Sequence, residues 1–201
     1  MKFLILLSPL DFLRFSYYNR AVSEQLRQRI NELIAEIARG NTAALDELAR
    51  LVSARMLSVA RSVLRDAAAA EDAVQDSFIK ILEKSNRFKP DTNGYAWICK
   101  IVYNTALNIA KRERVTVDIS ECFDLSDGTN VSERATVGMT VEKAMSVLDG
   151  TERRVIYQKY FMDFTVRDSA KALGLSKSKV SRTVLAAEEK MRKFMNAHDA
   201  T

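Results

Sequence analysis

Apolar residues recur at every third and fourth position along most of the chain, which is the spacing that places them on one face of an α-helix. In the first such segment they are Leu26, Ile30, Leu33 and Ile37. A strand leaves a different pattern, an alternation of apolar and polar residues bounded by turn residues. That alternation is scarce here, and so are glycine (6 in the chain) and proline (2). We therefore predict an all-α fold.

The helical pattern predicts two small domains joined by a linker. Four helices are expected in the first domain: one that begins at Val22 and breaks at Gly40, and others over residues 43–64, 68–85 and 94–114. The segment 116–138 has five acidic residues against one base, which is typical of an acidic linker. The predicted domains are accordingly residues 22–115, a helical bundle, and residues 139–196.

The first 21 residues stand apart from this pattern. The apolar run from Met1 to Leu10 is interrupted by Ser8 and Pro9, and it is too short to span a bilayer. We expect residues 1–21 to be an extension outside the core, from a start codon assigned too early. The alternative is a weak amphipathic membrane contact, and no stable membrane insertion is expected.

The second domain ends in a helix-turn-helix pattern over residues 166–184. Ala170 is small where two helices would cross, Gly174 supplies the positive φ of a helix C-cap, and Ser176 can cap the second helix. The wedge between the helices would be sealed by Leu173, Leu175, Val180 and Val184.

The face of the second helix that this packing leaves exposed is polar and basic. We expect it to contact phosphates or base edges through Lys177, Ser178, Lys179, Ser181, Arg182 and Thr183. Residues 171–193 hold seven bases against two acids, which suits a phosphate partner. The alternative is an ordinary helical hairpin with a solvated basic face.

Composition excludes several classes of function. The net charge of +5 permits nucleic-acid binding without requiring it. Two cysteines, Cys99 and Cys122, and the single histidine His198 cannot build a disulfide framework, a usual zinc site or a convergent catalytic set. We predict a non-enzymatic protein of a reducing cytoplasm, with no catalytic residue, metal or cofactor.

Two helices of the first domain carry polar faces. The third predicted helix presents acids and an amide at helical spacing, at Glu71, Asp72, Gln75 and Asp76, while its apolar residues are expected to turn inward at Val74, Phe78, Ile81 and Leu82. This face is a plausible protein-docking site. The alternative is a solvated face whose acids favour the helix N-terminus.

The fourth predicted helix combines amides, bases and aromatics. Lys100, Asn104, Asn108 and Lys111 share one side, Arg112 and Arg114 follow, and Tyr95, Trp97 and Tyr103 lie nearby. Single-stranded nucleic acid is bound by such a mixture, through ring stacking and amide hydrogen bonds. The polar loop before the helix, Lys89 to Asn93, is expected to form a small pocket for an unstacked base.

The order of these parts resembles a bacterial RNA polymerase sigma factor of the extracytoplasmic-function group of the sigma-70 family. The resemblance is carried by the helix from Ala70 to Leu82, the segment Arg87–Pro90, the segment Tyr95–Ile98 with Tyr103–Asn104, and the terminal helix-turn-helix. It covers residues 30–194 and implies a sigma region 2-like domain and a region 4-like domain.

The resemblance implies a transcription initiation factor. Its acidic helix would dock on the clamp helices of the largest subunit of core RNA polymerase through Asp72, Gln75, Asp76 and Ile79. The minus-ten element would be recognised and melted by Lys89, Asp91, Thr92, Asn93, Trp97, Lys100, Asn104, Asn108, Lys111 and Arg112. The helix after Ser176 would read the minus-thirty-five element, and promoter DNA would be bound both double-stranded and melted.

The chain departs from the family pattern at several positions. Ser181 and Ala186 stand where the family often has bases, and Ser169 stands where it usually has an aliphatic residue, which predicts weaker packing of the first helix of the motif. The promoter sequence is therefore not transferred. The alternative function is a helix-turn-helix regulator that no longer binds polymerase, and a helical scaffold for another protein is a further one. An anti-sigma factor is a partner consistent with both the scaffold and the sigma factor.

Overall fold

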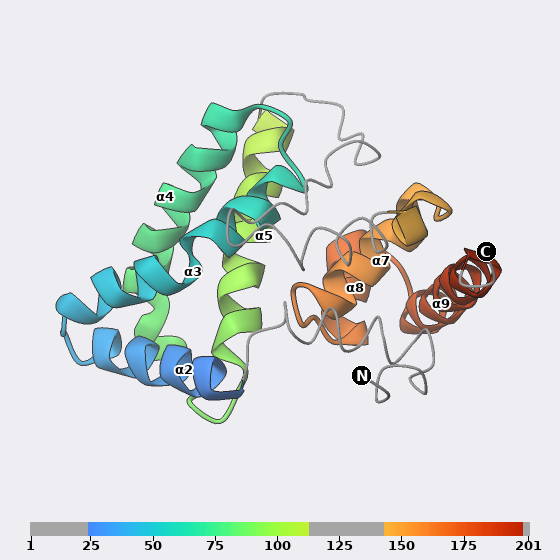
Figure 1. The fold of residues 1–201 in the computed structure, drawn as a ribbon. Coiled ribbons are helices and arrows are strands. Elements are labelled where there is room, and N and C mark those ends of the chain that lie inside the picture. The colour runs from blue at the N-terminus through green and yellow to red at the C-terminus, as the bar shows by residue number, and fades with distance from the viewer. Residues whose placement is uncertain (1–23, 113–142, 199–201) are drawn as a thin grey trace. The chain divides into compact units, whose positions relative to one another are not determined.

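The computed structural model describes residues 24–112 and 143–198, and every regular element in these two ranges is helical. The two ranges belong to two compact units (Figure 1). The all-α prediction is confirmed. The predicted extension 1–21, the linker 116–138 and the start of the second domain at residue 139 lie outside the described residues, so the predicted domain limits stay predictions.

The N-terminal unit contains the four predicted helices, with ends shifted by a few residues. They are α2 (Glu24–Ala38), α3 (Ala43–Arg61), α4 (Ala67–Lys84) and α5 (Gly94–Arg112), with a short 3₁₀ turn η1 (Ser85–Arg87) after α4. α3 ends before the predicted residue 64, because the chain turns at Ser62 and buries Val63 and Leu64. Asp66 then begins the next helix by accepting a hydrogen bond from the amide of Ala69 at 2.7 Å.

Small residues decide which face of α4 is buried. The helix packs against α3 and α5 through Ala70, Ala73, Ser77 and Ile81. Because these side chains are short, the neighbouring helices can approach closely. The expectation that Leu82 turns inward is wrong: it is 46% exposed, and Val74 and Phe78 are only half-buried.

Two tyrosines of α5 belong to the core. Tyr95 and Tyr103 are 2% and 5% exposed, on the same side of the helix as Ile98 and Val102. Their suggested role as stacking aromatics is therefore wrong for the free protein, because no base can reach their ring faces. Trp97 is half-buried and packs on Phe88, with ring centroids 5.4 Å apart.

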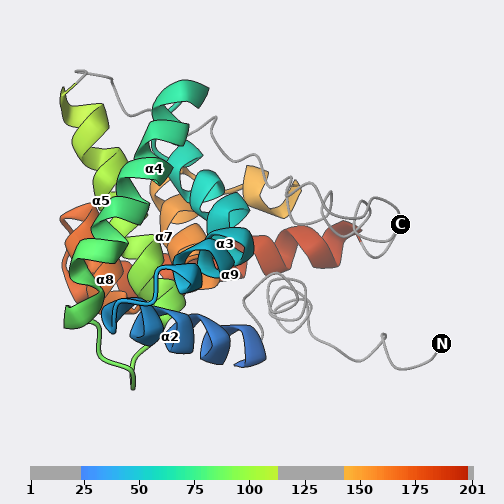
Figure 2. The same cartoon turned by 90° about the vertical axis from the view of Figure 1, so that its left-hand side faces the viewer.

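An ion pair and the packing of apolar residues hold α2 against the rest of the unit. Arg29 donates from Nε and Nη2 to the two carboxylate oxygens of Glu47 on α3, at 2.7 and 2.6 Å. The hydrogen bonds from this guanidinium lower the pKa of Glu47. α2 also packs against α5, at the end of the unit where the loop before α5 lies (Figures 1 and 2).

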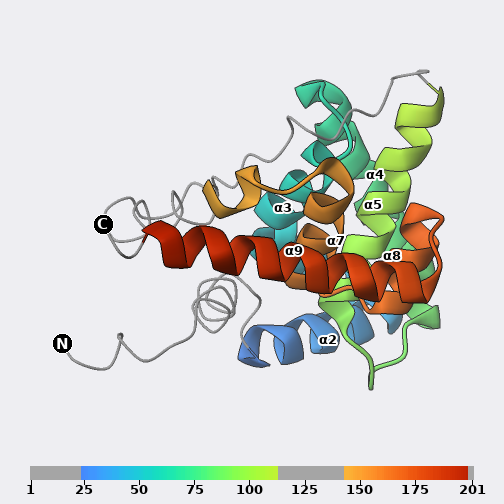
Figure 3. The same cartoon turned by 90° about the vertical axis from the view of Figure 1, so that its right-hand side faces the viewer.

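The C-terminal unit is built around a long last helix. It contains α7 (Gly150–Tyr160), α8 (Val166–Leu173) and α9 (Lys177–His198), and α7 and α8 both pack against α9 (Figure 3). The wedge predicted for the helix-turn-helix is confirmed, since Ala170, Val180 and Val184 form a buried cluster with Val155 and receive Leu173 and Leu175.

The turn of the motif is capped as predicted. Gly174 ends α8 with φ of 66°, in the left-handed region that glycine adopts most easily. Ser176 accepts a hydrogen bond from the amide of Lys179 at 3.2 Å. Thr165, which the sequence analysis did not identify, caps the start of α8 by accepting from the amide of Asp168. Ser169 is buried at 2% exposure, so it packs within the unit although it is not aliphatic.

The start of α7 is fixed by a reciprocal cap. Asp149 accepts hydrogen bonds from the amides of Glu152 and Thr151, and the Glu152 carboxylate accepts one from the amide of Asp149 at 2.9 Å. These backbone bonds lower the pKa of Asp149. Lys190 of α9 contacts the same Glu152 at 2.7 Å, which joins the cap to the last helix.

Candidate polymerase and nucleic-acid interfaces

The outer face of α4 gathers all four residues predicted to bind polymerase. Asp72, Gln75, Asp76 and Ile79 follow one another at helical spacing and are exposed, Ile79 by 57%. Leu82 extends the same face by three residues. Two large apolar side chains are exposed to solvent beside three polar ones, and such a surface is suited to binding a protein partner. We call these five residues the α4 face.

A hollow of about 420 Å³ lies at the N-terminal end of the α4 face. Asp72, Gln75 and Asp76 line it together with Ile109 and Arg112 of α5. Arg112, predicted to contact the minus-ten element, is thus placed with the predicted polymerase-binding residues. The hollow carries both signs of charge, which offers complementary contacts to a partner with mixed charges.

The polar stripe predicted on α5 is present. Asn104, Asn108 and Lys111 are exposed and Lys100 is half-buried, at positions that repeat every three or four residues. Trp97 lies one turn before Lys100, and its half-buried ring is supported by Phe88. The stripe therefore offers amides and bases to a ligand, whereas only one of the three aromatic residues remains partly accessible.

Two predicted site residues in the loop before α5 make hydrogen bonds that fix the conformation of the loop. Thr92 donates from Oγ1 to the carbonyl of Lys89 at 2.7 Å, and Asn93 caps α5 by accepting from the amide of Ala96 at 3.0 Å. Lys89 and Asp91 are exposed. Within this loop, a ligand therefore meets the side chains of Lys89 and Asp91 more readily than those of Thr92 and Asn93.

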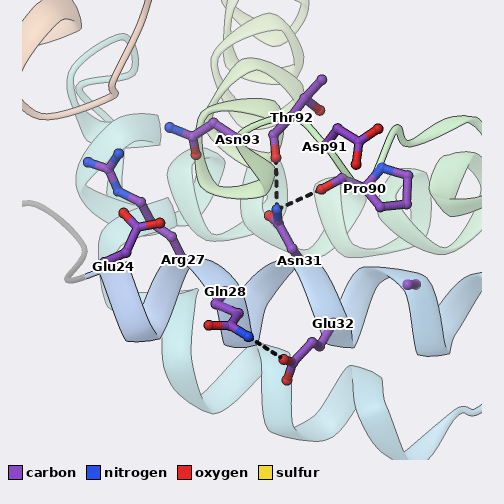
Figure 4. Close-up of a pocket in the computed structure, with 10 residues that line it drawn as sticks. Glu24, Arg27, Gln28, Asn31, Glu32, Pro90, Asp91, Thr92 and Asn93 are labelled. Carbon is purple, nitrogen blue, oxygen red and sulfur yellow. Dashed lines mark hydrogen bonds between the residues drawn. The ribbon is translucent and has the colours of Figure 1, made fainter.

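Asn31 of α2 fixes this loop, and sequence reasoning missed it. Its amide nitrogen donates to the carbonyls of Pro90 and Thr92 at 3.0 and 2.8 Å (Figure 4). Its Oδ1 accepts from the amide of Gly94 at 2.8 Å. The signal in the sequence is an amide inside the apolar stripe of the first helix, directly after Ile30. The polar atoms of such a side chain have hydrogen-bond partners only if another segment of the chain supplies them.

The clamp by Asn31 leaves a pocket of about 580 Å³ between α2 and the loop (Figure 4). The loop wall is Pro90 to Asn93, and the helix wall comprises Glu24, Arg27, Gln28, Asn31, Glu32 and Ala35. The loop was predicted to form a pocket for an unstacked base. The structure places the predicted residues Asp91, Thr92 and Asn93 in a pocket, and it adds a helix wall that the sequence analysis did not anticipate.

The helix-turn-helix presents most of its predicted DNA-contacting face to solvent. The exposed members are Lys177, Ser178, Lys179, Ser181 and Arg182. Thr183 was expected on the same face, and this is wrong: it is only 9% exposed. It precedes Val184 and lies one turn after Val180, so it falls on the side of α9 that packs against the rest of the unit.

The C-terminal unit also has a mainly apolar hollow of about 440 Å³. Its lining includes Val155, Val180 and Val184, and its rim carries Val166 and Leu185, which are exposed by 41% and 65%. Ser181, a predicted DNA contact, lines the same hollow.

Within residues 24–112 and 143–198, no three or more histidine, cysteine or acidic side chains come together in a way that would hold a metal ion. Among the helices of those ranges, none is both long enough and apolar enough to cross a membrane.

The family model and the relatives that match this chain are all described as sigma factors or as a part of one. The family model described as Sigma-70 region 2 matches residues 48–116. The ECF RNA polymerase sigma factor SigM of Mycobacterium tuberculosis is 24% identical over 166 residues, which cover 82% of this chain and 83% of that protein. The RNA polymerase sigma-H factor of Pseudomonas aeruginosa is 24% identical, covering 84% of this chain and 95% of that one. The ECF RNA polymerase sigma factor SigX of Bacillus subtilis is 25% identical over 66% of this chain and 74% of its own.

The fold is shared with a solved structure of CnrH in complex with the cytosolic domain of CnrY. The TM-score is 0.50 and the identity 24%, and the match covers 84% of this chain and 98% of that one.

Proposed function

We propose that this chain, a member of the extracytoplasmic-function group of the sigma-70 family and thus a transcription initiation factor, docks on core RNA polymerase through the α4 face. The observation that carries the proposal is that face itself: Ile79 and Leu82 stand exposed beside Asp72, Gln75 and Asp76. Exposed apolar side chains beside polar ones are a composition typical of a protein interface. The clamp helices of the largest polymerase subunit are the proposed partner.

Promoter DNA would then be bound by both units. In the N-terminal unit, the α5 stripe and the loop before α5 would capture bases of the melted minus-ten element. In the C-terminal unit, the exposed face of α9 would lie in the major groove of the minus-thirty-five element. Unstacking costs a few kcal/mol per base, and stacking and pocket contacts of about 1–3 kcal/mol per base offset it. Opening of the duplex would therefore be driven by binding energy, without a catalytic step.

A regulator that no longer binds polymerase is less well supported. Such a protein would gain nothing from keeping two large apolar side chains exposed on α4. An anti-sigma factor is proposed as a further partner, with the complex of CnrH and the cytosolic domain of CnrY as support.

Removal of the polar part of the α4 face tests the proposal. We expect the triple variant Asp72→Ala/Gln75→Ala/Asp76→Ala to bind core polymerase at least about tenfold more weakly, a loss of about 1.4 kcal/mol, and to lose run-off transcripts from genomic fragments. The three residues are exposed, so folding should persist. Binding would be measured by titration of core polymerase with labelled protein.

A matched control is available on the other helices. Gln25→Ala/Asp46→Ala removes an exposed amide and an exposed acid from α2 and α3, and it should bind core polymerase like the wild type. Equal binding by the triple variant and this control would contradict docking through the α4 face. Failure of the folded wild type to bind any core polymerase would contradict the proposed function.

The DNA-contacting face of α9 makes a separate prediction. Replacing Lys177, Lys179 and Arg182 by glutamine should make the negative slope of log affinity against log salt shallower, by about 0.9 for each side chain that contacts a phosphate. The control is Lys193→Gln near the other end of α9, where the side chain is 75% exposed and pairs with Glu189. If the negative slope became equally shallow in the triple variant and in Lys193→Gln, this face would not be the DNA-binding surface.

A further inference from the structure

The hollow at the N-terminal end of the α4 face, hereafter the α4–α5 hollow, has a second wall that the proposed docking surface does not include. α4 begins beside the end of α5, which packs along it (Figure 1). The α4 wall includes Asp66, Asp72 and Asp76, and the α5 wall consists of Ile109 and Arg112. A partner that reaches into the hollow from the α4 face must therefore also meet the end of α5.

The guanidinium of Arg112 is available to such a partner. Arg112 is exposed, and its side chain makes no hydrogen bond or ion pair with another residue of the described ranges. A guanidinium carries five N–H donors in a planar fork, whose geometry matches that of a carboxylate. The donors of Arg112 can therefore be used by an acidic side chain of another protein.

The facing polar side chains of α4 also lack partners. Asp72, Gln75 and Asp76 are exposed, and their side chains form no hydrogen bond or ion pair within the described parts of the chain. Asp66 differs, because its carboxylate caps α4. If Arg112 served to neutralise these acids, it would be expected to pair with one of them. The α4–α5 hollow instead offers two carboxylates and a guanidinium to a partner that carries both bases and acids.

The position of Arg112 on α5 separates it from the residues expected to contact DNA. Successive residues of an α-helix are about 100° apart, so Arg112 is turned away from Lys111 and toward the side of Ile109. The carboxylates across the hollow would repel a phosphate that approached Arg112. Both the direction of the side chain and the charge around it therefore favour a protein partner over the minus-ten element.

We propose that Arg112 belongs to the polymerase-docking surface, where its guanidinium binds a carboxylate of core RNA polymerase, and that it does not contact the minus-ten element. The inference rests on the proposed function, because it assumes docking through the α4 face, and it extends that surface to α5. Asp72 and Asp76 would meet bases of the same partner, and the half-buried Ile109 would be covered between these contacts. Arginine is among the residue types that contribute most to protein interfaces.

Titration of core polymerase with the labelled full chain, in the absence of DNA, tests the proposal. Arg112→Gln should bind at least about fivefold more weakly than the wild type. Arg112→Lys keeps the charge and loses the planar fork, so its affinity should fall between the two. The matched control is Arg39→Gln, at an exposed arginine directly after the end of α2, and it should bind like the wild type.

Run-off transcription separates polymerase binding from DNA binding. With core polymerase raised until each variant is fully bound, Arg112→Gln should give as many transcripts from genomic fragments as the wild type. A contact with the minus-ten element predicts the reverse, an unchanged affinity for core polymerase and a low transcript yield at saturation. Arg112 and Arg39 are exposed, so the variants are expected to fold, and the fluorescence of Trp97 in urea checks this.

Several outcomes overturn the proposal. They are an unchanged affinity of Arg112→Gln for core polymerase, an equal loss in Arg39→Gln, and a low transcript yield of Arg112→Gln at saturation. Tighter binding by Arg112→Gln would also overturn it, because Arg112 would then oppose the bases of the partner. A wild-type chain that binds no core polymerase would contradict the proposed function itself. If the wild type binds, Asp72→Ala/Gln75→Ala/Asp76→Ala binds weakly and Arg112→Gln binds normally, only the assignment of Arg112 is wrong.

Discussion

Replacement of Gly94 by alanine is expected to destabilise the N-terminal unit by about 2–4 kcal/mol. A Cβ atom at this position would lie 2.5 Å from Oδ1 of Asn31 and 2.9 Å from Cδ1 of Ile34, both closer than real Cβ contacts allow. Ile34 is fully buried and cannot move away at low cost. Overpacking of this kind costs about 1–3 kcal/mol.

The usual effect of this substitution has the opposite sign. Alanine favours a helix over glycine by up to about 1 kcal/mol and also restricts the unfolded chain. The clash outweighs this gain because the side chain that must move is Asn31, which makes three hydrogen bonds to the loop and to Gly94. Each bond contributes about 0.5–1.5 kcal/mol, so moving Asn31 relieves the clash at a further cost.

The chain contains both a specific probe and a matched control. Trp97 is the only tryptophan and lies in the N-terminal unit, so its fluorescence in urea follows the unfolding of that unit. Gly150, like Gly94, is the first residue of a helix, but a Cβ there meets nothing within 4 Å. Gly150→Ala should therefore leave stability unchanged or raise it slightly.

A double variant identifies the cause. If the clash is with Asn31, adding Asn31→Ala to Gly94→Ala should cost less than the sum of the two single changes. A Gly94→Ala protein that unfolds at the wild-type urea concentration would show that the approach of α2 to α5 is not close in solution.

The contrast between Gly94 and Gly174 shows which parts of the fold can be predicted from sequence. Gly174, Ser176 and Ala170 act within a few residues of one another, and their spacing alone identifies the turn, its caps and the helix crossing. Gly94 has its role only because Asn31, 63 positions earlier, bonds to its amide. No local pattern contains that information, so the sequence did not predict the clamp by Asn31 or the helix wall of the pocket between α2 and the loop before α5.

The residues misplaced by sequence reasoning have a common cause. Leu82 was assigned to the core as an apolar residue, although the buried stripe of α4 is defined by the small residues Ala73 and Ser77. Tyr103 was named as a stacking residue for its aromatic ring and Thr183 was placed on the DNA-contacting face for its polarity, although each shares a helix face with buried apolar neighbours. In both kinds of error the position on the helix was decisive, and side-chain chemistry was given too much weight. The exposed Leu82 nevertheless enlarges the predicted α4 face.

Glu152→Ala is the second change with a large expected effect, a loss of about 2–3 kcal/mol from the C-terminal unit. The side chain is only 8% exposed and serves two partners: it accepts from the amide of Asp149 at 2.9 Å and from Lys190 at 2.7 Å. Its removal leaves that amide without its cap, which costs about 1 kcal/mol of stability. It also removes the ionic partner of Lys190. The hydrogen bond to Glu152 also raises the pKa of Lys190, which reflects the same attraction.

The two partners of Glu152 can be separated by further variants. Lys190 is 48% exposed, so water can solvate it when the carboxylate is lost, and Lys190→Ala should cost no more than about 1 kcal/mol. Glu152→Gln keeps an acceptor for the amide of Asp149 and should fall between the two. The expected order of destabilisation is therefore Glu152→Ala, then Glu152→Gln, then Lys190→Ala.

Hydrogen exchange resolves this effect to the unit that carries it. Peptides from α7 and α9 should exchange faster in Glu152→Ala by the factor that corresponds to the lost stability, about thirtyfold or more for 2 kcal/mol. Peptides from α3 and α5 should keep wild-type rates, because they belong to the other unit. α9 carries Lys177, Lys179 and Arg182, so affinity for duplex promoter DNA should fall together with this protection. If Lys190→Ala accelerated exchange as much as Glu152→Ala, the ion pair would dominate and the capping role assigned to Glu152 would be wrong.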